Sequence, residues 1–174
     1  FETFFRELGQ RIATRWGRHR YAPEALPTIA TEALTEARVH AHFGLDELLR
    51  WTLSAESISP QQFADSGFGQ PPIELFHHER FFLQALIWRD SSTDVHQHAF
   101  CGAWSVWLGG SVHTIYRFED QGPLGEGARQ GVLGCDSVEI LRPGDARPIV
   151  EGPGFLHSLY HLEHPSVSLL ARTI

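Results

Sequence analysis

Two histidines stand one residue apart, His96 and His98, in the stretch STDVHQHAFCGAWSVWLGG at residues 92–110. Two imidazoles can bind one metal ion at about 2 Å when both rings point to the same side of the chain. Residues i and i+2 share a face on a β-strand. If this stretch is a strand, we expect His96 and His98 to be two ligands of one ion.

A second pair with the same spacing, His40 and His42, stands in the stretch TEALTEARVHAHF, which is rich in Ala, Glu and Leu. That composition favours a helix, where residues i and i+2 lie about 200° apart around the axis. Two rings on opposite sides of a helix do not reach the same ion. The sequence therefore predicts a metal site at the first pair and none at the second.

The stretch PIVEGPGFLHSLYH offers a third ligand, His157. Glycines precede it by three and five residues, a turn-then-strand layout that can bring one more imidazole inward. His161 is the competing candidate, and we rank it as a residue that supports the ligands from behind. Cys101 is a further alternative ligand, although cysteine is commonly a small buried hydrophobic residue.

The elements that must hold these residues change in character along the chain. Apolar side chains recur at helical spacing up to about residue 51, and another short helix is expected over Ser59–Phe63. Gly and Pro are dense at residues 65–72, which marks the best boundary. We predict a helical lobe over residues 1–70 and a β-barrel over residues 71–174, packed as one compact unit.

After this boundary the sequence alternates between aromatic or β-branched runs and turn signals. Strands are predicted at residues 80–88, 103–108, 111–118, 137–141, 147–150 and 166–173. Turns are expected at Gly109-Gly110 and at Pro143-Gly144-Asp145, and a loop at residues 119–131. Short strands at such spacing indicate a sandwich or a barrel.

Alternation along the predicted strand after His98 leaves two faces to choose between. One face carries Ala103, Ser105 and Trp107, and the other carries Trp104, Val106 and Leu108. We favour the first face as the one that points into the barrel. Gln84, His113 and Tyr116 are further polar groups that could reach the cavity, and we rank His113 first as a structural residue or one that supports a ligand from behind.

Composition narrows the class of protein. The 174 residues include 14 basic and 21 acidic side chains, for a formal net charge of −7, which makes nucleic acid and anionic membranes poor partners. No apolar stretch approaches the roughly 20 residues that span a bilayer. Two cysteines do not make a disulfide framework, so a reducing cytoplasm is expected. With no methionine, the sequence is expected to be a piece of a longer chain.

These motifs together resemble the cupin superfamily, whose first motif runs H-x-H, a variable acidic position and a glycine, and whose second motif ends in G-x-x-H. The sequence is most similar to the cysteine dioxygenase group of thiol dioxygenases. That group has a strand ending in Trp, a Ser-Ser turn, H-x-H, and a glycine twelve residues on. The matching positions are Trp88, Ser91-Ser92, His96, His98 and Gly110. The resemblance implies a mainly β protein, a double-stranded β-helix or jelly-roll barrel preceded by a small helical lobe.

The sequence also departs from that group. The acidic ligand position falls on Gly102 or Ala103, and the cysteine that can crosslink to a tyrosine maps to Ala103. The group's Ser-His-Tyr triad maps to Ser168, Leu170 and Arg172, so only the serine is retained. Ile73-Glu74 stands near the place of the arginine that holds the substrate carboxylate. The resemblance therefore implies the architecture more firmly than it implies the substrate.

The function implied is a mononuclear non-haem iron dioxygenase with Fe(II) at His96, His98 and His157, acting on a small thiol or amino-acid-like anion with O2. Its thiol form makes a sulfinate. Ser168, Arg172 and Tyr116 are the expected catalytic residues. Imidazole ligands leave Zn, Mn, Ni and Cu open. The alternatives are a metal-dependent isomerase, lyase or hydrolase of the same fold, and a metal-dependent ligand-binding module.

Overall fold

The computed structural model describes residues 1–54, 72–89 and 92–174. The expected short helix at Ser59–Phe63 and nearly all of the expected boundary lie outside these residues. The N-terminal part contains helices and two single 3-10 turns. They are α1 (Glu2–Arg18), η1 (Pro23–Ala25), α2 (Leu26–Ala37), η2 (Val39–Ala41) and α3 (Leu45–Ser54).

The rest of the described chain is built from strands in two antiparallel sheets. The five-stranded sheet has the order β1-β2-β9-β4-β7, and the four-stranded sheet has the order β3-β8-β5-β6. The strands are β1 (Pro72–His78), β2 (Phe81–Trp88), β3 (His96–His98), β4 (Gly102–Leu108), β5 (Ser111–Gly125), β6 (Ala128–Leu141), β7 (Ala146–Ile149), β8 (Gly152–His161) and β9 (Ser166–Thr173). The predicted mainly β jelly roll with N-terminal helices is confirmed.

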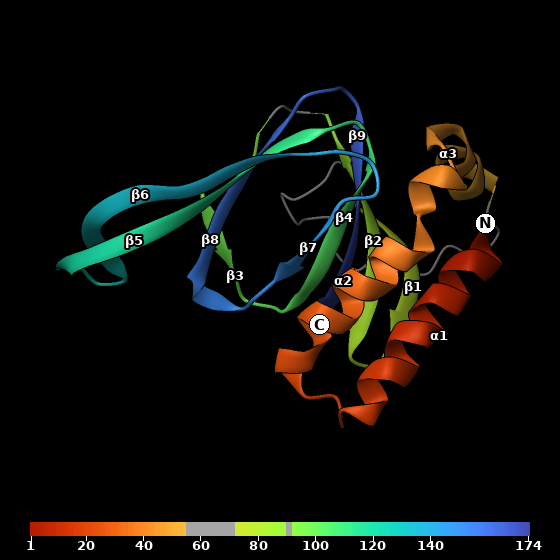
Figure 1. Ribbon diagram of the computed structural model, residues 1–174, viewed down its shortest axis with the longest axis horizontal. Coiled ribbons are helices and arrows are strands. Elements are labelled where there is room, and N and C mark those ends of the chain that lie inside the picture. The colour runs from red at the N-terminus through yellow and green to blue at the C-terminus, as the bar shows by residue number, and fades with distance from the viewer. Residues whose placement is uncertain (55–71, 90–91) are drawn as a thin grey trace.

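The helices cover the outer face of the five-stranded sheet (Figure 1). On α1, the buried Phe5, Leu8 and Ile12 recur every three or four residues, which places them on one side of the helix. The indole of Trp107 on β4 is fully buried against these helices and donates a hydrogen bond to the Phe43 carbonyl at 2.7 Å. This contact ties the helical part to the barrel.

Because helices cover one face of the five-stranded sheet and the second sheet covers the other, its central strands are buried on both faces. All eight residues of β2 are buried, so the run FFLQALIW shows no polar alternation. Trp107 packs toward the helices, whereas Trp104 and Val106 pack between the two sheets. The face of β4 that we favoured as inward is therefore wrong, and the opposite face lines the barrel.

The hairpin of β5 and β6 corrects a second expectation. Residues 119–131 were expected to form a loop, but the strands continue through them to the turn between Gly125 and Ala128. Figure 1 shows the outer half of this hairpin extending as a two-stranded ribbon away from the barrel. The Gly and Pro residues of this stretch coincide with irregularities in strand pairing at Asp120/Gly122 and Pro123/Gly125 instead of ending the strands.

Within the described residues, no helix is long and apolar enough to cross a membrane.

Candidate metal centre

The structure brings together the ring nitrogens of the three predicted ligands. The Nε2 atom of His157 lies 2.8 Å from Nε2 of His98 and 3.2 Å from Nε2 of His96. Two nitrogens that each bind one ion at about 2.1 Å are about 3.0 Å apart when they subtend 90°. Ring nitrogens this close need either a shared proton or a metal cation between them. The donor set therefore fits a divalent metal ion.

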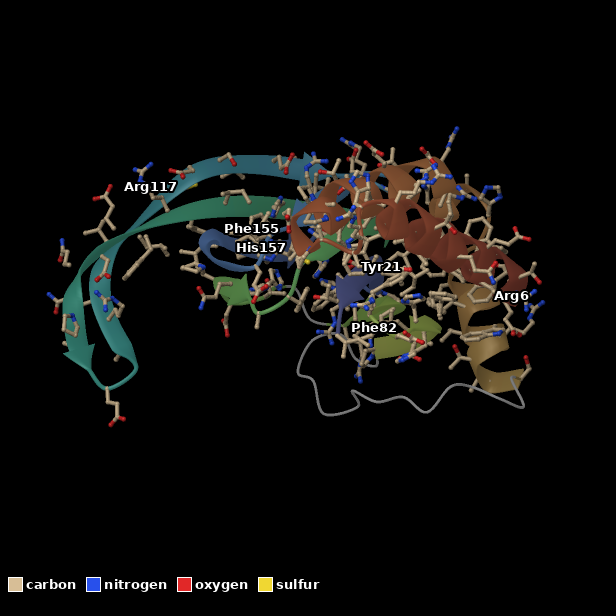
Figure 2. All side chains as sticks on the ribbon, turned by 90° about the horizontal axis from the view of Figure 1, so that it is seen from below. Arg6, Tyr21, Phe82, Arg117, Phe155 and His157 are labelled. Carbon is tan, nitrogen blue, oxygen red and sulfur yellow. The ribbon has the colours of Figure 1, made fainter. Side chains whose placement is uncertain are left out.

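Strand pairing explains the convergence. His96 on β3 is the direct cross-strand partner of His157 on β8, so both side chains stand on the same face of the four-stranded sheet. His98, two residues further along β3, returns to that face. Figure 2 shows His157 beside Phe155, between the helices and the projecting ribbon.

Hydrogen bonds behind the rings select which nitrogen faces the ion. His96 donates from Nδ1 to the carbonyl oxygen of Asp94 at 2.7 Å, which leaves Nε2 as the nitrogen with a lone pair. Behind His157, its Nδ1 lies 3.0 Å from Nε2 of His113. His113 is only 2% exposed, and its Nδ1 lies 2.9 Å from Oε1 of Glu139.

Burial keeps His98 and His157 neutral. It lowers the pKa of His157 to about 2 and that of His98 to about 4, with smaller contributions from the neighbouring histidines and, for His98, from Arg172. Metal binding needs the neutral imidazole. At neutral pH these two rings therefore do not have to lose a proton before an ion binds.

A carboxylate has no place at the positions where the resemblance would put an acidic ligand. A Cβ atom at Gly102 would lie 2.0 Å from the carbonyl oxygen of Ala171 on the neighbouring strand, so a side chain cannot stand there unless the backbone moves. Ala103 is fully buried in the core shared with the helices. The compact donor cluster that the described residues form holds three histidines and no carboxylate.

The three histidines stand on the wall of a cavity of about 270 Å³ between the two sheets. Arg172, Ser168 and Gln84 supply polar groups to the same cavity, and Phe100 and Trp104 are among its apolar walls. The cavity is at the small end of the range for ligand sites, which indicates a small ligand. Two of the three predicted catalytic residues, Ser168 and Arg172, thus share the cavity with the metal ligands.

The guanidinium of Arg172 is held between aromatic rings. It lies 4.5 Å from the ring centre of Phe82 and 4.7 Å from that of Phe100. Burial lowers its pKa, yet a guanidinium stays protonated at neutral pH. Ser168 accepts a hydrogen bond from the Trp88 indole at 3.0 Å, so its own hydroxyl hydrogen is available as a donor. The cavity therefore has a fixed positive charge and a hydroxyl donor.

Tyr116 does not join this group, because its hydroxyl is hydrogen-bonded to Ser158 at 3.1 Å and it is not among the residues that line the cavity. His161 is 1% exposed, shares a hydrogen bond with Ser111 and stacks on Trp88. It stands apart from the three-histidine cluster, as does Cys101, whose thiol donates to the Pro23 carbonyl on the helical side. Both cysteines are free thiols.

Sequence reasoning missed Glu139 and Arg147. Arg147 on β7 binds both carboxylate oxygens of Glu139 on β6, and Glu139 in turn binds His113. The two residues come from different sheets, so their pairing depends on how the sheets face each other. His113 lies behind His157, as expected of a residue that supports a ligand.

No protein-family model matches the chain, and no curated protein matches its sequence. Solved structures do resemble its fold. A cupin-2 domain protein from Shewanella frigidimarina is 11% identical over 75% of this chain and 92% of its own, with a TM-score of 0.42. Hydroquinone 1,2-dioxygenase from Sphingomonas, solved with 4-hydroxybenzoate, is 11% identical over 69% of this chain and 81% of its own, with a TM-score of 0.46.

The DMSP lyase DddQ from Ruegeria pomeroyi is 14% identical over 74% of this chain and 61% of its own, with a TM-score of 0.45. Two of these proteins are named for different activities, and all three are remote in sequence from this chain.

Proposed function

We propose that this protein is a metal-dependent oxygenase that oxidises a small anionic substrate with O2 at His96, His98 and His157. The observation that carries the proposal is the convergence of three Nε2 atoms on the wall of a cavity that Arg172 also lines. A metal ion and an anion-binding group then face the same small volume. The resemblance to thiol dioxygenases adds the choice of Fe(II) and O2.

Three neutral imidazoles leave the charge of a divalent ion uncompensated, whereas a two-His-one-carboxylate site reduces it by one. The exclusion of a side chain at Gly102 supports the three-histidine form. Such a site favours an anionic ligand, for example a thiolate or a carboxylate. When bound, Fe(II) supplies the one-electron chemistry that reaction with O2 requires.

The side chains on the cavity wall indicate which groups the substrate carries besides the one that binds the metal. Arg172 provides a half-buried positive charge for an anionic group, and Ser168 provides a hydroxyl donor. Trp104, Phe100 and Leu170 offer apolar surface around them. For a thiol substrate, both oxygen atoms of O2 would be added to the sulfur to give a sulfinate. Small thiols and amino-acid-like carboxylates are the first compounds to test.

The decisive experiment is metal analysis of protein purified without oxygen, followed by O2 consumption with a panel of small thiols and amino acids. We expect about one iron per chain and substrate-dependent O2 uptake. Zinc in place of iron, with no O2 uptake, would contradict the oxygenase and favour an isomerase, lyase or hydrolase. Recovery of a tightly bound compound unchanged would favour a ligand-binding module.

The role of Arg172 is tested by Arg172→Met, which keeps an unbranched apolar stem between Phe82 and Phe100 but removes the charge. Loss of one charge-assisted interaction costs about 1.5–3 kcal/mol, so we expect KM to rise roughly 10- to 100-fold with a smaller change in kcat. Steady-state O2 uptake measures both. An unchanged KM would show that the substrate does not contact Arg172. Arg172→Lys, which retains the charge, is the control. Its KM should lie between those of the wild type and Arg172→Met.

A further inference from the structure

A continuous chain of polar side chains runs from His157 in the four-stranded sheet to Arg147 on β7 of the five-stranded sheet. Nδ1 of His157 lies 3.0 Å from Nε2 of His113, and Nδ1 of His113 lies 2.9 Å from Oε1 of Glu139. Arg147 then donates to both oxygens of Glu139, at 2.9 and 2.5 Å. Four side chains from β8, β5, β6 and β7 are thus joined end to end.

The donor in each of these bonds follows from chemistry. Arg147 has only donors, and it holds the pKa of Glu139 down to about 2, so the carboxylate is ionised and can only accept. The proton between Glu139 and His113 therefore belongs to Nδ1 of His113. In a neutral imidazole the other nitrogen is then an acceptor, so Nε2 of His113 accepts from Nδ1–H of His157.

We propose that His113, oriented by Glu139 and Arg147, is a positioning residue that holds His157 as the Nδ1–H tautomer, with the lone pair of Nε2 aimed at the metal ion. This rests on the proposed metal site. Histidine ligands usually donate their second nitrogen directly to a carboxylate or a carbonyl. His96 does so with the carbonyl of Asp94, whereas His157 reaches its carboxylate through a second, buried histidine.

The same logic predicts that Glu139→Gln weakens the chain. Two N–H groups of Arg147 and one of His113 converge on the two carboxylate oxygens, with Oε1 shared by both residues, whereas an amide offers only one oxygen. Where the NH2 group faces His113, Nδ1 of His113 becomes an acceptor and Nε2 a donor, which favours the Nε2–H tautomer of His157 that cannot bind metal. His113→Leu simply removes the acceptor. His113→Gln can restore the pattern, because its amide accepts at one end and donates at the other.

The first test uses metal-free protein with 15N-labelled histidine. Long-range 1H–15N NMR spectra at neutral pH report which ring nitrogen of His157 carries the proton. We expect Nδ1–H in the wild type and a shift toward Nε2–H in Glu139→Gln. Finding Nε2–H in the wild type would overturn the proposal. This measurement involves no metal, so it gives its answer even if the proposed oxygenase function is wrong.

The second test titrates Co(II) into each variant and follows the visible spectrum of the bound ion. We expect His113→Leu and Glu139→Gln to bind Co(II) roughly 10- to 100-fold more weakly and with altered absorption bands. His113→Gln should bind Co(II) with nearly the wild-type affinity and spectrum. Asp136→Asn is the matched control, because Asp136 forms an exposed carboxylate–arginine pair with Arg117 on the same hairpin. Wild-type affinity and spectrum in both His113→Leu and Glu139→Gln would refute the positioning role. If His113→Leu does not fold, as judged by circular dichroism, the Co(II) affinity and spectrum of Glu139→Gln alone test the positioning role.

Discussion

The H-x-H spacing occurs twice in this chain, and the two pairs have different surroundings. His96 and His98 form the short strand β3, and their rings meet the ring of His157. His40 lies in the 3-10 turn η2 and its ring packs against Gly144, while His42 is exposed on the helical side. Identical spacing thus yields a three-nitrogen cluster in one place and two separate rings in the other.

The difference lies in the backbone. A strand returns every second side chain to the same face, and the paired strand β8 then adds a third ring from across the sheet. A 3-10 turn advances by about 120° per residue, so alternate residues point apart. The spacing of two histidines therefore indicates a metal site only when the strand and its partner are also known.

The largest expected effect is the loss of metal affinity when a histidine of the His96/His98 pair, but not of the His40/His42 pair, is replaced. Structural zinc sites bind with about 10–16 kcal/mol shared among four ligands, so one ligand is worth roughly 100- to 1,000-fold in affinity. We expect His98→Ala to lose metal by at least this factor and His42→Ala to retain it. Metal content after purification without oxygen measures both. Stoichiometric iron in His98→Ala would show that the ligand set is wrong.

The next largest effect is the pH dependence of stability that burial causes at His161, a histidine outside the ligand set. Burial, with a contribution from His164, lowers the pKa of His161 to about 4, against about 6.5 in an unfolded chain. Between these values the unfolded chain binds a proton that the folded chain does not, so stability falls as the pH drops from 6.5 to 4. The loss from this residue is ~3 kcal/mol.

Urea unfolding of metal-free wild type and His161→Gln across this pH range tests the expectation. Both proteins contain the other buried histidines, so the difference between the two curves belongs to position 161. We expect the wild type to lose more stability than the variant as the pH falls. Parallel curves would show that His161 is not responsible.

The smallest effect concerns the site where His40 packs. Gly144 has φ +99°, and a Cβ there would lie 2.5 Å from Cε1 of His40. Gly144→Ala should therefore destabilise the protein by about 1–3 kcal/mol without changing the metal affinity of the folded molecule. Gly125→Ala, in open space on the ribbon, is the matched control. Equal unfolding midpoints for the two variants would contradict a structural role for this contact.

Much of the fold was predictable, because short aromatic and β-branched runs punctuated by glycine and proline require strands and turns whatever the final packing. The errors came where tertiary contacts override local pattern. The stretch around Pro123 and Gly125 was expected to be a loop but continues a strand pairing. The inward face of β4 was also misjudged, since β4 is buried on both sides and its alternation carries no polarity signal.

For the candidate site, the motifs named His96, His98 and His157, and the structure places these three together. Arg172 and Ser168 also reach the cavity, whereas Tyr116 does not. Glu139 and Arg147 could not be found from the sequence. Neither residue stands in a motif. Glu139 reaches the site because β6 pairs with β5, and Arg147 reaches it because β7, in the other sheet, faces β6.

The sequence alone establishes which side chains are available for a metal site. It contains two histidines at strand spacing, a third after a glycine turn, a glycine where an acidic ligand would stand, and an arginine in the last strand. These are local properties of residue type and spacing. Tertiary packing determines which rings meet, leaves no room for a side chain at Gly102, and places His113 and Glu139 behind His157. Contacts between strands distant in the chain depend on sheet order and on the packing of one sheet against the other, and no short stretch of sequence encodes them.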